Sequence, residues 1–115
     1  MSDTPPNELD AAFGMVVRFT LREGGAESFD QLMRDTVAKI RIHEPETIAY
    51  VVQSVEGEPN LRIFYELYAN PAAFEHHQAQ DYIDHFKAER ENYVTDVQVD
   101  RLGVVTAAGA VLGQP

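Results

Sequence analysis

A histidine in the second half of the chain has the spacing best suited to acid–base chemistry. His77 follows Phe74 by three residues and Ala73 by four, so on a helix it shares their apolar stripe. A partly buried imidazole titrates near neutral pH and can remove the proton of a phenolic hydroxyl. The same position also suits a histidine that braces the fold by hydrogen bonds. The spacing leaves both roles open.

Glu66 is the second titratable residue of interest, because it stands between Phe64 and Tyr68 in a strand-like segment. A carboxylate in such surroundings is costly to bury without a partner. One interpretation is a structural ion pair with Arg18 at a dimer face. The other is a catalytic acid or base whose pKa is raised by burial.

Several tyrosines could bind an aromatic ligand, since their hydroxyls can hold a phenolate or enolate and their rings can stack on a flat substrate. Ordinary core packing explains the same residues. We predict that Tyr65 and Tyr82 are hydroxyl partners of His77. The predicted walls of the substrate site are Tyr50, Tyr68, Phe86 and Met15.

A metal site or a bound cofactor is not predicted. His77, Asp81 and His85 are spaced four apart and would share one helix face, but we expect the helix to break near Gln80. His76 is expected to point toward solvent. The chain has no cysteine and no glycine-rich phosphate loop, so we predict no metal, nucleotide or flavin.

The composition excludes several classes of partner. The chain has 115 residues, with 19 acidic and 9 basic side chains and a formal net charge of -10. This excess argues against nucleic acid and against an anionic membrane surface. No apolar run reaches the roughly 18 residues of a membrane span, and the N-terminus is polar and acidic rather than a signal peptide. We expect a cytoplasmic protein.

Hydrophobic periodicity predicts one domain of alternating strands and helices. Strands are expected at residues 13–21, 47–55, 61–69 and 95–105. A helix of about four turns is expected to end at His43-Glu44-Pro45. Asn70-Pro71 predicts the start of a short helix, and a second follows from about residue 81 to 93. Residues 1–11 are expected to be a flexible arm, 12–105 the domain and 106–115 a flexible tail.

This order of elements predicts an α+β, ferredoxin-like split βαβ fold with a four-stranded antiparallel sheet. Right-handed crossovers place the helices on one face of the sheet. We assign Met15, Val17, Ile63, Tyr65 and Leu67 to the helix side. The open side would then carry Val16, Arg18, Phe64, Glu66 and Tyr68, which is too apolar to face water. A homodimer through Arg18, Phe64, Glu66 and Tyr68 is therefore predicted.

The segment from Ile63 to Phe86, IFYELYANPAAFEHHQAQDYIDHF, contains a recognisable sequence pattern. It comprises Glu66-x-Tyr68, Ala73-Phe74, His77, Tyr82-Ile83 and Phe86. This resembles the antibiotic biosynthesis monooxygenase family of dimeric α/β barrels, and the segment from His43 to Tyr50 resembles the family's Glu-Pro-Gly segment. Glu46 stands in place of the usual glycine, and Tyr68 stands where many members have tryptophan. The resemblance covers roughly residues 12–105.

The resemblance implies two protomers packed sheet to sheet, with a cavity in each between sheet and helices. It implies a cofactor-independent monooxygenase that oxidises a small phenolic, quinol or polyketide-like aromatic substrate with dioxygen. The alternatives left open are a non-catalytic dimeric module that binds a small ligand, and an isomerase or lyase acting through an enediolate. Haem degradation fits less well, because the chain has no tryptophan.

Overall fold

A computed structural model describes residues 11–109, so residues 1–10 of the predicted arm and 110–115 of the predicted tail lie outside this range. The elements follow in the order β1 (Phe13–Leu21), α1 (Ala26–His43), β2 (Thr47–Val55), β3 (Glu58–Tyr68), α2 (Pro71–Gln78), α3 (Asp81–Glu89), the 3₁₀ turn η1 (Arg90–Asn92) and β4 (Val94–Gly103). Within residues 11–109, no helix is both long and apolar enough to cross a membrane.

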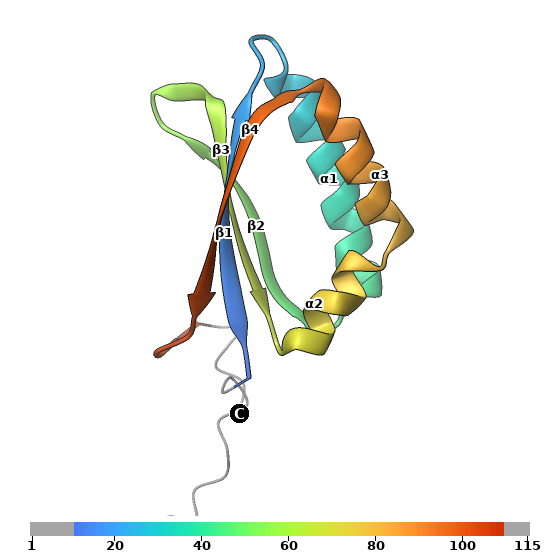
Figure 1. Cartoon of the computed structure of the whole chain (residues 1–115), viewed down its shortest axis with the longest axis vertical. Helices are drawn as coiled ribbons and strands as arrows, with labels where there is room; N and C mark the ends of the chain where they lie inside the picture. Colours follow the sequence, from blue (N-terminus) through green and yellow to red (C-terminus); the bar gives the residue numbers. More distant parts are fainter. Residues whose placement is uncertain (1–10, 110–115) are drawn as a thin grey trace, which may run out of the picture.

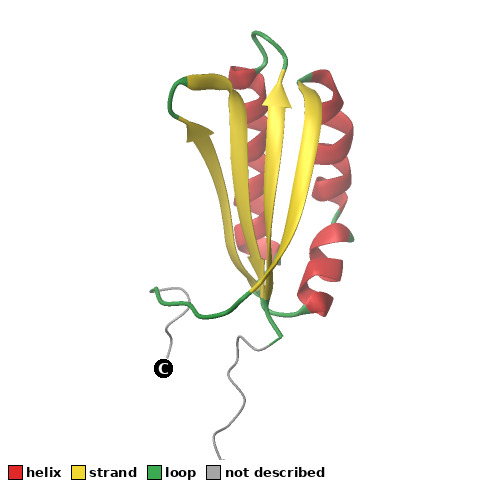
Figure 2. Cartoon of the chain, turned by 60° about the vertical axis from the view of Figure 1, so that its left-hand side comes forward, coloured by secondary structure: helices red, strands yellow, loops and turns green. Residues whose placement is uncertain are grey.

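The strands form one antiparallel sheet in the order β2-β3-β1-β4, with β2 and β4 at its edges. All three α-helices cover the same face of the sheet (Figure 1). The opposite face carries no helix, as Figure 2 shows from a second direction. This arrangement confirms the predicted ferredoxin-like α+β fold.

The element boundaries depart from the prediction mainly at β3. This strand begins at Glu58 rather than at Leu61, because Gly57 adopts a φ of 80° and closes a short turn directly after β2. At the start of α2 the prediction is confirmed: the Asn70 side chain accepts a 2.8 Å hydrogen bond from the Ala73 amide, and Pro71 takes the first helical position.

The core lies between the sheet and the helices and is largely aromatic. Phe19 of β1 packs against Phe64 of β3 and Phe29 of α1, with ring centroids 4.6 and 5.5 Å apart. Phe86 of α3 closes this cluster from the other helix. Each of these four rings is at most 4% exposed. Burial on this scale contributes roughly 1.5–3 kcal/mol per large apolar side chain to folding.

The predicted faces of β3 are wrong. Antiparallel partners lie on the same face of a sheet, and Met15 is opposite Glu66 while Val17 is opposite Phe64. Phe64, Glu66 and Tyr68 therefore point to the helices, where they are buried. The residues of β3 on the open face are Ile63, Tyr65 and Leu67. Both alternate sets of β3 are rich in large apolar residues, so alternation alone could not assign the register.

The correction changes the surface available to a second copy of the chain. Of the residues predicted for the open side, Val16 and Arg18 lie there, opposite Tyr65 and Ile63. The predicted ion pair between Arg18 and Glu66 does not form, because Glu66 points to the helices. The open face instead exposes apolar residues such as Val51 (43%) and Leu102 (38%). The homodimer itself stays a prediction.

Candidate functional site

A buried pair of side chains joins α2 to the end of α1. The His77 Nδ1 atom lies 2.7 Å from Glu44 Oε1, and both residues are only 4% exposed. The Glu44 carboxylate also accepts hydrogen bonds from the hydroxyls of Thr47, at 2.7 Å, and Tyr82. One carboxylate thus collects donors from the start of β2, from α2 and from α3.

These three donors decide the protonation state of Glu44. Burial raises the pKa of the Glu44 carboxyl, but the hydrogen bonds from His77, Tyr82 and Thr47 outweigh burial and hold the pKa below its ordinary value. An ionised carboxylate only accepts hydrogen bonds, so the hydrogen between the two residues belongs to His77 Nδ1. The Nε2 atom of His77 is then the ring nitrogen left for a ligand.

His77 forms part of the wall of a cavity of about 180 Å³ between the sheet and the helices. Met15 of β1, Tyr50 of β2, Glu66 of β3 and Phe86 of α3 line the same cavity. Its remaining wall is mainly apolar and includes Val97 and Val99 of β4, which are 38% and 50% exposed. The cavity therefore opens between β4 and α3.

Glu66, the carboxyl group that lines this cavity, has its pKa shifted in the opposite direction to that of Glu44. Burial raises the pKa of Glu66 above its ordinary value, and the hydrogen bond from the Tyr68 hydroxyl, 2.5 Å from Glu66 Oε1, only partly offsets this. Tyr68 is fully buried and packs against the His77 ring, with centroids 5.3 Å apart and the ring planes tilted by 49°. The cavity wall thus offers an imidazole nitrogen and a carboxyl group whose pKa is raised.

Tyr50 adds a hydroxyl to this wall. Burial raises the pKa of Tyr50 well above its ordinary value, and the charges of Glu66 and Glu44 raise it further. The phenol therefore keeps its proton and can donate a hydrogen bond. The Tyr50 and His77 rings lie 5.5 Å apart, centroid to centroid, so the two side chains line neighbouring parts of the cavity wall.

The family follows from the sequence match. Residues 12–89 match the family described as antibiotic biosynthesis monooxygenase. The chain belongs to this family. No curated protein sequence matches the chain.

Solved structures share the fold of this family member. A Caulobacter crescentus protein that carries the same family name is 23% identical, with a TM-score of 0.80, over 85% of this chain and 93% of that chain. A Pseudomonas aeruginosa protein is 22% identical, with a TM-score of 0.77, over 85% and 98%. A Shewanella oneidensis protein is 25% identical, with a TM-score of 0.74, over 80% and 89%.

The structure brings together only some of the site residues predicted for this family member. The residues that line one cavity are His77, Glu66, Tyr50, Phe86 and Met15. Tyr68 contacts the site through Glu66. The Tyr82 hydroxyl donates a hydrogen bond to Glu44, so Tyr82 acts on His77 only through this carboxylate. Tyr65 lies on the open face of the sheet, and its predicted place beside His77 is wrong.

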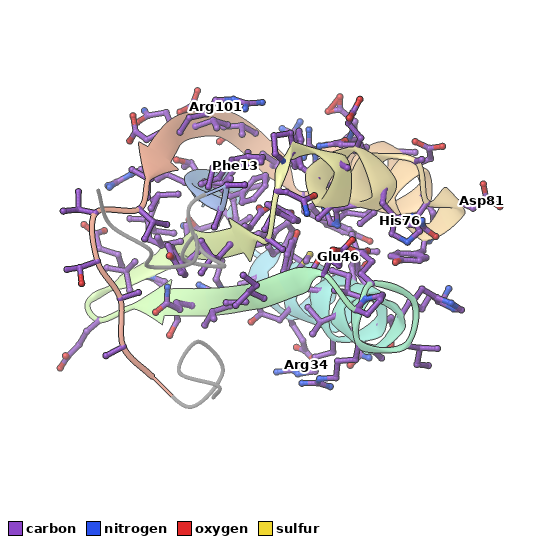
Figure 3. The ribbon with its side chains drawn as sticks, turned by 90° about the horizontal axis from the view of Figure 1, so that it is seen from below. Phe13, Arg34, Glu46, His76, Asp81 and Arg101 are labelled. Carbon is purple, nitrogen blue, oxygen red and sulfur yellow. The ribbon has the colours of Figure 1, made fainter. Side chains whose placement is uncertain are left out.

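The other two histidines of α2 and α3 lie apart from this cavity. His76 is exposed, and its Nε2 atom lies 3.0 Å from the carbonyl oxygen of His43 (Figure 3). His85 is also exposed. The break between α2 and α3 falls at Ala79–Gln80, as predicted, so His77, Asp81 and His85 do not share one continuous helix.

Sequence reasoning missed Glu44 and Arg90. Glu44 was treated as the end of a helix and as part of the family-like segment from His43 to Tyr50, but not as a site residue, although a carboxylate at a helix C-terminus is unfavourable toward the helix dipole. That mismatch is the signal that could have identified it, since a glutamate there needs other partners. Arg90, which lines the cavity, follows α3 directly, and no motif in the sequence marks it.

Proposed function

We propose that this protein is a cofactor-independent monooxygenase that oxidises a small phenolic or quinol substrate with dioxygen. The observation that carries the proposal is a histidine on a cavity wall, with one ring nitrogen bound to a buried, ionised carboxylate and the other free. Membership of the antibiotic biosynthesis monooxygenase family supports the same class of reaction.

The proposed reaction begins with removal of the phenolic proton by His77 Nε2. The Glu44 carboxylate stabilises the imidazolium that forms, because its charge lies 2.7 Å from Nδ1. The electron-rich phenolate transfers one electron to dioxygen, and the two radicals combine at a ring carbon that carries hydrogen. The product of this step is a ring peroxide.

Loss of water completes the reaction. The O–O bond breaks, the ring carbon loses its proton, and the carbon keeps one oxygen atom as a quinone carbonyl. The substrate supplies all four electrons, so one phenol and one dioxygen give one quinone and one water. Glu66 is the group that supplies a proton to the departing oxygen, since its pKa is raised by burial. The Tyr50 hydroxyl holds the substrate oxygen.

Oxygen uptake by the purified protein, kept in a metal chelator, tests the proposal. A panel of hydroquinones, single-ring phenols and anthrones is supplied, and uptake of one dioxygen per substrate is expected, with one labelled atom from ¹⁸O₂ in the product. His77→Ala should lower the rate by about 10²- to 10⁴-fold, the usual contribution of a general base. His76→Ala, the matched control at the preceding residue, should leave the rate unchanged.

A non-catalytic binding module is the competing function, and one observation favours it. Glu44 ties together β2, α2 and α3, so His77 could serve only to brace these elements. Ligand binding in a thermal-shift screen without oxygen uptake would establish this function instead. Turnover under anaerobic conditions would indicate an isomerase or lyase, because only the oxygenase requires dioxygen.

We also propose that two copies of the chain pack through their open sheet faces. The open face has no helix over it and carries exposed apolar residues, among them Val51 and Leu102. Light scattering should give twice the mass of one chain. Introducing aspartate at Val51 should give the mass of a single chain, whereas a single-chain mass for the unaltered protein would exclude the dimer.

A further inference from the structure

We propose that Arg90 binds the carboxylate of a phenolic acid, so that the substrate of this site is a single-ring aromatic acid. The inference deepens the proposed function and rests on it for the identity of the site. Arg90 is the first residue of η1, is half-buried, and lines the same cavity as His77 and Glu66. The sequence alone gave no reason to select this arginine.

The guanidinium group of Arg90 is held by aromatic rings rather than by an acid. Its central carbon lies 5.6 Å from the centroid of Phe19 and 5.3 Å from that of Phe86. Stacking uses the flat faces of the guanidinium and leaves its N–H groups, which lie in the plane, able to donate hydrogen bonds. Both rings belong to the core, so they fix the position of the charge.

Within residues 11–109, Arg90 has no acidic partner, although the chain has 19 acidic and 9 basic residues. The ion pairs found within residues 11–109 join Arg62 to Asp30 and His77 to Glu44, and neither includes Arg90. Glu66 lines the same cavity wall, where burial raises its pKa above the ordinary value and the Tyr68 hydroxyl is its hydrogen-bond donor. A ligand in the cavity would therefore lie beside the positive charge of Arg90.

Lys87 strengthens this positive character. It lies one turn before Arg90 and lines the same cavity. Its ammonium group donates a hydrogen bond to the side-chain oxygen of Gln78. The charge of Arg90 acts on both Tyr50 and Glu66, in the direction that favours their ionised forms. An anion that enters beside β4 would thus meet two cations, in a protein whose net charge is -10.

The size of the cavity limits the rest of the substrate. A cavity of about 150 Å³ is known to hold a benzene ring, and one water takes up about 30 Å³. The volume of about 180 Å³ therefore accommodates one ring with a small substituent. A fused three-ring polyketide exceeds this volume and would have to extend through the opening between β4 and α3. A carboxylate suits Arg90, because a guanidinium binds it through two parallel hydrogen bonds.

The chain contains a matched control for Arg90. Arg101 of β4 also stacks over two phenyl rings, with its guanidinium carbon 5.6 Å from the centroid of Phe13 and 5.3 Å from that of Phe74. Figure 3 shows Arg101 and Phe13 on the same side of the molecule. Arg101 lines a different hollow, together with these two rings, and does not line the His77 cavity.

The experiment measures binding by calorimetry without oxygen, with 3- and 4-hydroxybenzoate and the matching hydroxybenzamides as probes. The unaltered protein should bind at least one acid about tenfold or more tightly than its amide, as expected for a hydrogen bond to a charged group. Arg90→Gln should remove this preference by weakening the acid alone. Arg90→Lys should restore part of it, and Arg101→Gln should leave it unchanged.

Equal affinity of the unaltered protein for acid and amide would overturn the proposal, and so would an unchanged acid preference in Arg90→Gln. If Arg90→Gln fails to fold, the acid preference of the unaltered protein and of Arg90→Lys decides the matter. A protein that binds these acids but consumes no oxygen would overturn the oxygenase proposal alone. One that oxidises neutral quinols without preferring acids would overturn the role of Arg90 alone.

Discussion

Replacing Glu44 with glutamine tests the centre of the proposed site. Glutamine has nearly the same shape as glutamate, and its carbonyl oxygen can still accept from His77 and Thr47. Its amide group must face the Tyr82 hydroxyl, which then has to accept rather than donate. The substitution removes the charge without opening a cavity, so it isolates what the ionised carboxylate contributes.

The expected loss of stability follows from the three hydrogen bonds. A bond to a charged group contributes roughly 1.5–3 kcal/mol and a neutral one roughly 0.5–1.5 kcal/mol, so each loses about 1 kcal/mol when the charge is removed. Burial of the charge opposes folding, and its removal offsets part of this loss. We expect Glu44→Gln to lower the free energy of unfolding by about 1–3 kcal/mol at neutral pH.

The pH dependence gives a sharper test of Glu44. Because the folded pKa of Glu44 lies below its ordinary value of 4.5, the stability it supplies is present above that value. This stability is lost as the pH falls through the folded pKa. The difference between unaltered protein and Glu44→Gln should therefore shrink on acidification.

Denaturant titrations at a fixed protein concentration, run at neutral pH and in stepwise acidification, measure the Glu44 effect. Glu46→Gln is the matched control, since Glu46 is exposed only two residues away, and it should change the free energy of unfolding by less than about 0.5 kcal/mol. A difference between Glu44→Gln and the unaltered protein that stays constant across this range would refute an ionised, hydrogen-bonded Glu44.

Two further substitutions test other parts of the structure. Glu66→Gln should raise the free energy of unfolding at neutral pH, because an acid whose folded pKa is raised costs stability above its unfolded pKa. Melting temperatures of the variant should rise more at neutral than at acidic pH. A lower melting temperature than that of the unaltered protein at neutral pH would contradict the raised pKa of Glu66. Phe64→Ala should cost about 3–5 kcal/mol in denaturant titrations, since the ring is 1% exposed on the helix side of β3. The control Val105→Ala, at a residue 97% exposed, should cost less than about 0.5 kcal/mol, and a similarly small cost for Phe64→Ala would contradict its position.

The sequence carried enough information for the elements and their order. The alternation of β1 and the Asn70-Pro71 start of α2 are local signals, and the structure has both elements where these signals predict them. The face of β3 is not a local property, because it depends on which residues of β1 lie opposite. The pairing of Met15 with Glu66 determines which face of the sheet each β3 residue occupies, and no pattern within β3 alone predicts that pairing.

The site was predictable in part for the same reason. His77 could be found from its place on the apolar stripe of α2, and it is buried there. Its partner Glu44 lies 33 residues earlier, so only the packing of α2 against the end of α1 brings the two together. Arg90 reaches the cavity because it follows α3 directly, and its contact with Phe19 of β1 spans most of the domain.

The two buried carboxylates acquire different roles from their surroundings alone. Glu44 accepts three hydrogen bonds that hold its pKa below the ordinary value, whereas burial raises the pKa of Glu66, whose donor is the Tyr68 hydroxyl. The charge of Glu44 also raises the pKa of Glu66, so ionisation of the first favours protonation of the second. Such a divided pair suits a reaction that needs a base and an acid at the same pH. In the proposed reaction Glu44 acts through His77, and Glu66, which lines the cavity, is the carboxyl group placed to contact the substrate.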